Sequence, residues 1–68
     1  MVEAKDVIDA ILKIKPDLTQ DDAVKLYENS SVPNLLTDKL VRAHAYSEDL
    51  AETVLFENEL YGNADKID

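Results

Sequence analysis

The side chains that could take part in catalysis are few and isolated in this sequence. His44 is the only histidine, and the chain has no cysteine. A serine nucleophile needs a neighbouring general base, and Ser30, Ser31 and Ser47 have only this one imidazole in the chain. The single glycine, Gly62, lies near the C-terminus, which rules out a glycine-rich phosphate-binding loop. We therefore predict that the protein is not an enzyme and that it holds no cofactor.

One acidic stretch has part of the spacing of a calcium-binding loop. Four oxygen-bearing residues occupy its first, third, fifth and twelfth places: Asp17, Thr19, Asp21 and Glu28. Asp22 stands where such a loop needs glycine for its sharp turn. A helix that begins just after Thr19 explains the same residues better, because a threonine at that place accepts hydrogen bonds from free amide groups. The sequence therefore predicts no metal site.

A helix-turn-helix arrangement for DNA binding can also be drawn over residues 20–46. It would place Lys39, Arg42 and His44 on the second helix. Duplex binding depends on cationic contacts to phosphate, whereas this chain has 15 acidic residues against 7 Lys and Arg and a formal charge of -8. We expect no direct binding to nucleic acid. An acidic helical surface could instead imitate a phosphate backbone and occupy the groove of a basic protein.

The elements that carry these residues are expected to be helical. One glycine and two prolines in 68 residues are too few for a strand-and-turn architecture. The sequence predicts an all-α domain, a small bundle of three to four helices at about 3–15, 20–30, 35–46 and 47–61, in which the last two are either separate or joined into one long helix.

The first two predicted helices have clear boundaries. Pro16 disfavours helical geometry at the residue before it, so the first helix should end at about Lys15. Thr19, with Asp22 three residues later, is placed to cap the second helix. The first helix is amphipathic, with these apolar residues at helical spacing: Ala4, Val7, Ile8, Ile11, Leu12 and Ile14.

The second half of the chain is expected to follow a loop at 29–34. Ser47 is followed by two acidic residues and can begin a new helix, so we favour a break near Tyr46 over one continuous helix. Gly62 is expected to end the last helix, which gives a domain over 1–62 and a flexible acidic tail at 63–68. A seam of mostly apolar or small residues repeats every three to four positions: Leu36, Leu40, Ala43, Ser47, Leu50, Val54, Glu57 and Tyr61.

The composition limits the size of the core and suggests a compartment. With 46% hydrophobic residues, 68 residues can build one small core at most. The absence of cysteine removes disulfides and thiolate zinc sites and fits a reducing compartment. No apolar run approaches the ~18 residues of a membrane span, and the N-terminus lacks the layout of a secretion signal. We expect a cytoplasmic protein without a membrane partner.

Two short motifs are similar to those of the small three-helix ubiquitin-binding CUE type. In that type an apolar-proline pair closes the first helix and a double leucine ends the third. The corresponding places here are Ile14-Lys15-Pro16 and Leu40-Val41, so that Lys15 and Val41 depart from the pattern. The likeness covers about half of the chain and rests on patterns common to many small helical domains. We do not assign the chain to this family.

Acidic residues are concentrated on the last predicted helix. Between Ala43 and Ala64 there is no Lys or Arg. Glu48, Glu52 and Glu59 form one stripe on a helix, with Asp49 and Glu57 elsewhere on its circumference. Such a stripe is either a solvated face or a docking surface for a basic partner.

The same predicted helix carries an apolar pair beside the acidic stripe. Phe56 and Leu60 are one helical turn apart and lie away from the expected core side. Either another layer, such as the N-terminal helix, covers them, or they belong to an interface. An interface suits so short a chain, because a core of this size rarely supplies more than ~3–5 kcal/mol.

These observations predict a small acidic non-catalytic module for protein-protein interaction or assembly, self-associating through its C-terminal helix. The alternative is an acidic regulator or inhibitor that binds a basic protein, such as a nucleic-acid-binding one, by charge mimicry. The expected partner is a protein, either a second copy or a basic one, and no small-molecule substrate is expected. The predicted partner-binding residues are Glu48, Asp49, Glu52, Phe56, Glu59 and Leu60.

Overall fold

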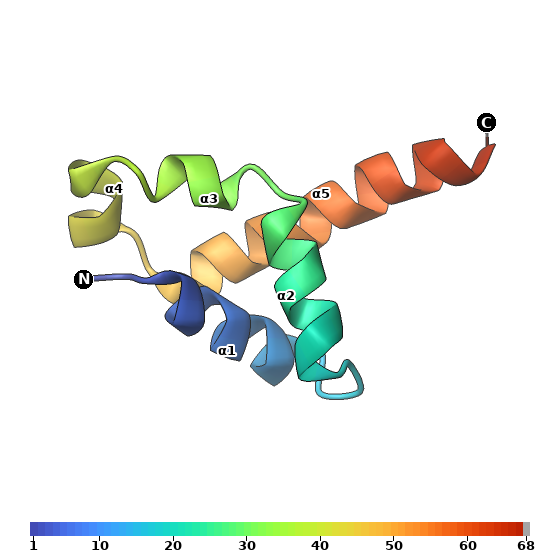
Figure 1. Ribbon diagram of the computed structural model, residues 1–68, viewed down its shortest axis with the longest axis horizontal. Coiled ribbons are helices and arrows are strands. Elements are labelled where there is room, and N and C mark those ends of the chain that lie inside the picture. Colours follow the sequence, from blue (N-terminus) through green and yellow to red (C-terminus); the bar gives the residue numbers. More distant parts are fainter. Residues whose placement is uncertain (68) are drawn as a thin grey trace.

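Helices are the only regular secondary structure in the described part of the chain (Figure 1). The structure, a computed structural model, describes the backbone of residues 1–67 and the side chains of residues 1–60. The prediction of an all-α domain is confirmed: three longer helices and two short ones pack against each other. The helices are α1 (Ala4–Ile14), α2 (Gln20–Glu28), α3 (Val32–Leu35), α4 (Lys39–His44) and α5 (Ser47–Ile67).

The first two helices begin and end where local chemistry dictates. Helix α1 ends at Ile14, just before the position that Pro16 disfavours. The predicted cap of α2 is confirmed, because the Asp22 amide donates to Thr19 Oγ1 over 3.1 Å and the Thr19 amide donates back to Asp22 Oδ2 over 3.4 Å.

The segment between α2 and α5 differs from the predicted loop and helix. Helix α3 begins at Val32, inside the predicted loop 29–34, with Pro33 at its start, where a missing amide hydrogen costs nothing. The predicted helix 35–46 is shorter than expected, because the chain turns after α3 and the helix α4 spans only Lys39–His44. Asp38 is the N-cap of α4, and its Oδ1 accepts a hydrogen bond from the Leu40 amide over 2.8 Å.

The break before the last helix is confirmed, but the predicted end of that helix is wrong. Ser47 is the first residue of α5, and the Tyr46 carbonyl accepts from the Leu50 amide over 3.1 Å. The backbone stays helical through Gly62 and reaches Ile67. The predicted flexible tail at 63–68 remains a prediction, because the side chains of these residues lie outside the described part of the chain.

The hydrophobic core lies where α1 and α2 pack against α5 and against each other, with α3 closing one side (Figure 1). Three members of the predicted apolar faces are instead exposed: Ile14, which is 43% accessible, Leu40, which is 70% accessible, and Ala43. The seam through Leu40 fails because α4 is a separate short helix with no buried residue. The buried residues are Val7, Ala10, Ile11, Ala23, Tyr27, Val32, Leu36, Leu50, Ala51 and Val54.

Candidate protein-binding surface

All six predicted partner-binding residues lie on one exposed side of α5. Leu50, Ala51 and Val54 face the core from the opposite side of the same helix. We call the exposed side the outer face of α5. It consists of Glu48, Asp49, Glu52, Phe56, Glu59 and Leu60, all of which are exposed.

The apolar pair on this face is uncovered. Phe56 is 60% and Leu60 52% accessible to solvent. The alternative in which the N-terminal helix folds over them is wrong, because α1 packs on the core side of α5 through Ala10 and Ile11. The structure therefore leaves an aromatic and a branched aliphatic side chain in water next to a row of carboxylates.

The outer face of α5 is negatively charged because it carries four of the five acids in residues 47–60. Residues 47–60 contain five acids and no Lys or Arg. Glu57 turns away from this face and holds α3: its Oε1 accepts from the Ser31 amide over 2.9 Å, and its Oε2 from the Ser31 hydroxyl over 2.5 Å. The other four acids stay on the outer face, where nearby carboxylates repel one another.

A small depression lies beside the outer face. It has a volume of about 100 Å³ and runs between the α1–α2 connection, α2 and α5. Leu18, Leu26 and Leu55 give it a partly apolar lining, and Lys15, Asn58 and Glu59 complete it. The depression shares Glu59 with the outer face, but neither Phe56 nor Leu60 lines it, and Leu55 lies across the row of acids from them.

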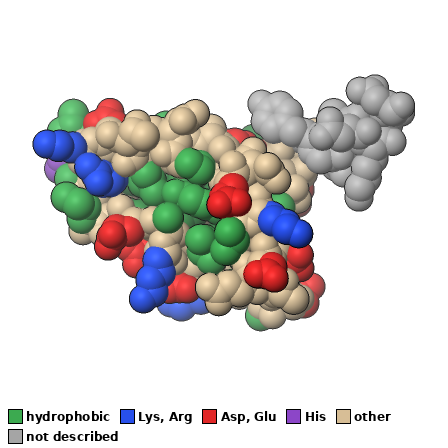
Figure 2. All heavy atoms as spheres, viewed as in Figure 1, with side chains coloured by type: hydrophobic (Ala, Val, Ile, Leu, Met, Phe, Trp, Pro, Cys, Tyr) green, Lys and Arg blue, Asp and Glu red, His purple; other side chains and the backbone are tan. Residues whose placement is uncertain are grey.

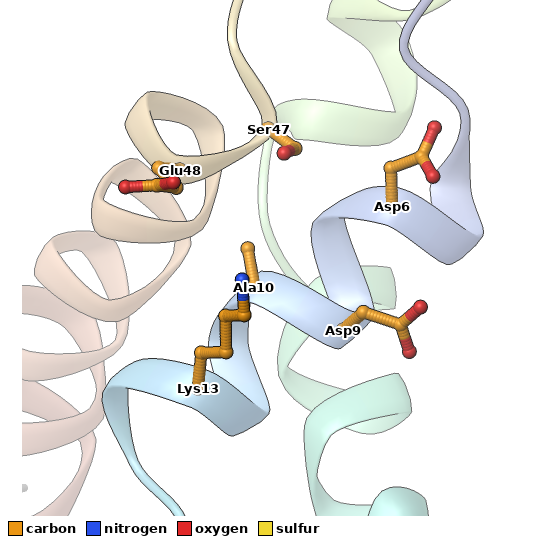
Figure 3. Close-up of a pocket in the computed structure, with 6 residues that line it drawn as sticks. All are labelled: Asp6, Asp9, Ala10, Lys13, Ser47 and Glu48. Carbon is orange, nitrogen blue, oxygen red and sulfur yellow. The ribbon is translucent and has the colours of Figure 1, made fainter.

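A second depression, of about 190 Å³, lies between α1 and the start of α5. It is lined by Asp6, Asp9, Lys13 and Glu48, together with Ala10 and Ser47. Figure 3 shows the carboxylates of Asp6 and Asp9 pointing away from Glu48, so the acids do not converge on one point. No group of three potential metal ligands occurs among the residues that the structure describes.

Two of the residues considered above for catalysis or calcium binding, Ser30 and Thr19, instead make hydrogen bonds that join or cap helices. The Ser30 hydroxyl donates to the Tyr27 carbonyl over 2.6 Å and accepts from the Val32 amide over 3.2 Å, which joins α2 to α3. Thr19 caps α2, and His44 is exposed at the last turn of α4. The sequence analysis recognised the cap but not the two serine contacts.

A second exposed surface, which sequence reasoning missed, lies at the end of the molecule where α4 is (Figure 1). Leu40 is 70% and Tyr46 73% accessible. Together with Lys39, Arg42 and His44 they form what we call the α4 end. Figure 2 shows basic and hydrophobic side chains and the single histidine gathered there, over α4. The apolar seam had assigned Leu40 to the core, so its exposure could not be expected.

The α4 end is held to the rest of the protein by few contacts. The Val2 amide donates to the Arg42 carbonyl over 2.9 Å. Arg42 Nε is buried and lacks a hydrogen-bond partner among the described residues, although the side chain as a whole is half-buried. Part of its guanidinium group is therefore buried at this end.

Comparisons with protein-family models, curated proteins and solved structures found no match. Among the described residues, no helix combines the length and the apolar character that crossing a bilayer would require.

Proposed function

We propose that this chain is a small non-catalytic interaction and assembly module that self-associates through the outer face of α5. The observation that carries the proposal is the exposure of Phe56 and Leu60 within a row of acids, on the side of α5 that faces away from the core. In this proposal the partner is a protein, and no metal, cofactor, small molecule, membrane or nucleic acid is bound.

The size of the protein supports an association of this kind. Among the side chains that the structure describes, ten form the buried core, and three of these are alanine. A core of this scale rarely supplies more than ~3–5 kcal/mol. Burying Phe56 and Leu60 against a partner would add apolar area that the chain cannot bury by itself, at roughly 25 cal/mol per Å² before the costs of association.

The test is the solution mass of the chain against concentration, measured by sedimentation equilibrium. We expect the wild-type mass to rise with concentration and the Phe56→Ser variant to need at least about tenfold more protein for the same average mass. Ile14→Ser is the matched control, because Ile14 is also an exposed apolar residue on a helix but lies outside the outer face. An unchanged mass for Phe56→Ser would overturn the proposal, as would an equal effect in the control.

The second candidate function is an acidic regulator that captures a basic protein. It is supported by the four acids of the outer face and the absence of a base from 47–60. Poly-L-lysine is a suitable probe, because binding by charge should weaken steeply as salt rises.

A set of charge-neutralising variants tests this second function. Replacing Glu48, Glu52 and Glu59 by Gln should weaken binding to poly-L-lysine. The control replaces three exposed acids elsewhere, Asp9, Asp17 and Glu28, by Asn or Gln, and so makes the same change in net charge. Equal weakening by both sets would mean that total charge, and not the outer face, binds the probe.

A further inference from the structure

The outer face of α5 is poorly suited to pair with a second copy of itself. A symmetric contact would bring the same four acids of each chain together around Phe56 and Leu60, with no Lys or Arg in residues 47–60 to separate them. Like charges brought together at an interface oppose association. Self-association through this face therefore requires a different surface on the second copy.

The α4 end has the complementary properties. It carries the cations of Lys39 and Arg42 and exposes Leu40 and Tyr46 to 70% and 73%. Asp38 is the only acid in residues 38–46, and its carboxylate is already occupied as the cap of α4. This end therefore offers apolar side chains beside positive charge, where the outer face offers them beside negative charge.

The two surfaces do not satisfy each other within one chain. Figure 1 shows α4 at one end of the molecule and α5 running away from it toward the C-terminus. Phe56 lies nine residues after the start of α5, about 13 Å along the helix axis. Because all four large apolar side chains remain more than half exposed, neither surface covers the other in the monomer.

We propose that copies of this chain associate head to tail, with the α4 end of one copy bound to the outer face of α5 of the next. This inference rests on the proposed function and names the surface that the outer face contacts. Leu40 and Tyr46 cover Phe56 and Leu60, while Lys39 and Arg42 lie opposite Glu52 and Glu59.

A contact between two different surfaces has a distinct consequence for assembly. Every copy that binds through one end leaves its other end free, so the association continues into a ring or an open chain and does not stop at a dimer. Salt should weaken it because opposite charges meet in the contact.

Two double variants separate this arrangement from a symmetric one. The first, Lys39→Glu with Leu40→Asp, disables the α4 end, and it preserves the helix because acids are favourable in a first helical turn. The second, Phe56→Asp with Leu60→Asp, disables the outer face. Lys25→Glu is the control, since Lys25 is an exposed cation on α2 outside both surfaces. Circular dichroism checks that all three variants remain folded.

The decisive measurement is the mass of each variant alone and of the two double variants mixed in equal amounts. We expect each double variant to be monomeric at concentrations where the wild type and Lys25→Glu assemble beyond a dimer. The mixture should give a 1:1 complex of twice the chain mass of 7.6 kDa, because one intact α4 end and one intact outer face remain.

Other outcomes overturn the inference in distinguishable ways. If the α4-end variant assembles like the wild type while the outer-face variant is monomeric, the outer face pairs symmetrically, and only the head-to-tail arrangement fails. If both double variants assemble like the wild type, or if the wild type is monomeric at every concentration, the proposed self-association fails with it. A mixture that stays monomeric while each double variant is also monomeric likewise rejects the head-to-tail contact.

Discussion

Helices α1 and α4 both carry apolar side chains, yet these side chains lie in different environments. Helix α1 buries Val7, Ala10 and Ile11 between α2 and α5, whereas α4 has no buried residue and exposes Leu40. Apolar side chains at helical spacing thus stabilise the fold in one case and remain on the surface in the other. The difference places the fully buried side chains on α1, α2, α3 and α5, while α4 contributes only the partly buried Val41.

The comparison also explains why the two exposed surfaces lie where they do. The two sides of helix α5 differ. Its inner side completes the core with α1, and its outer side is exposed to solvent. The α4 end is attached by the backbone bond from Val2 to Arg42 and by Val41 and Ala45, which pack partly buried against the core. Substitutions on these surfaces should therefore change association while leaving the core intact.

The largest expected effect contrasts a core residue with a residue of the α4 end. Ile11→Ala should lower the free energy of unfolding by about 2–5 kcal/mol, because Ile11 is fully buried and its truncation leaves a cavity. Leu40→Ala should change it by less than about 0.5 kcal/mol, since the side chain is already 70% exposed. Urea unfolding followed by circular dichroism, at a concentration that keeps the chain monomeric, measures both. Similar losses for the two variants would contradict the division between core and α4 end.

The contact between Glu57 and Ser31 should give the next largest effect. Glu57→Ala removes a carboxylate that accepts two hydrogen bonds from Ser31 and joins α5 to α3. Charged hydrogen bonds contribute about 1.5–3 kcal/mol, and we expect about 1 kcal/mol here because Ser31 is exposed. Glu59→Ala, on the outer face of the same helix, is the control and should have little effect on the monomer. A double-mutant cycle with Ser31→Ala should show coupling between the two residues, and additive losses would reject the contact.

Signals confined to a few neighbouring residues predicted much of the fold. Pro16 located the end of α1, Thr19 the start of α2, and Ser47 the start of α5. The exposed side of α5 could also be predicted, because on a helix as long as α5 the residue spacing alone separates the inner from the outer side.

Features that depend on distant contacts could not be predicted in the same way. The bond between Ser31 and Glu57 spans 26 residues, and nothing local indicates it. Leu40 was assigned to the core because the seam assumed one helix through 35–46, although Asp38 was an available capping signal for a new start. Gly62 did not end α5, since a glycine permits a helix end without requiring one.

A smaller effect distinguishes the caps of α2 and α4. Thr19→Ala should cost about 1 kcal/mol of global stability, because α2 contributes Ala23 and Tyr27 to the core. Asp38→Ala removes the corresponding cap of α4 but should mainly increase local hydrogen exchange in residues 39–44, as no core residue lies there. Amide exchange and urea unfolding together measure the two effects. Equal losses of global stability would mean that α4 folds as part of the core.

The smallest expected effect is a loss of stability at high pH, which tests the burial of Tyr27 in the core. Burial raises the pKa of the Tyr27 hydroxyl above the usual tyrosine value of about 10, because the core disfavours its charged form. The folded state therefore holds this proton more tightly than the unfolded state, and its contribution to stability is complete below about pH 10 and is lost as pH rises above that value. Thermal unfolding of the wild type should show a decline in that range, and Tyr27→Phe should show a smaller one. Tyr46→Phe is the matched control, because Tyr46 is 73% exposed, and it should leave the decline unchanged. If Tyr27→Phe and Tyr46→Phe shift the curve equally, the alkaline loss does not come from the hydroxyl of Tyr27 on α2.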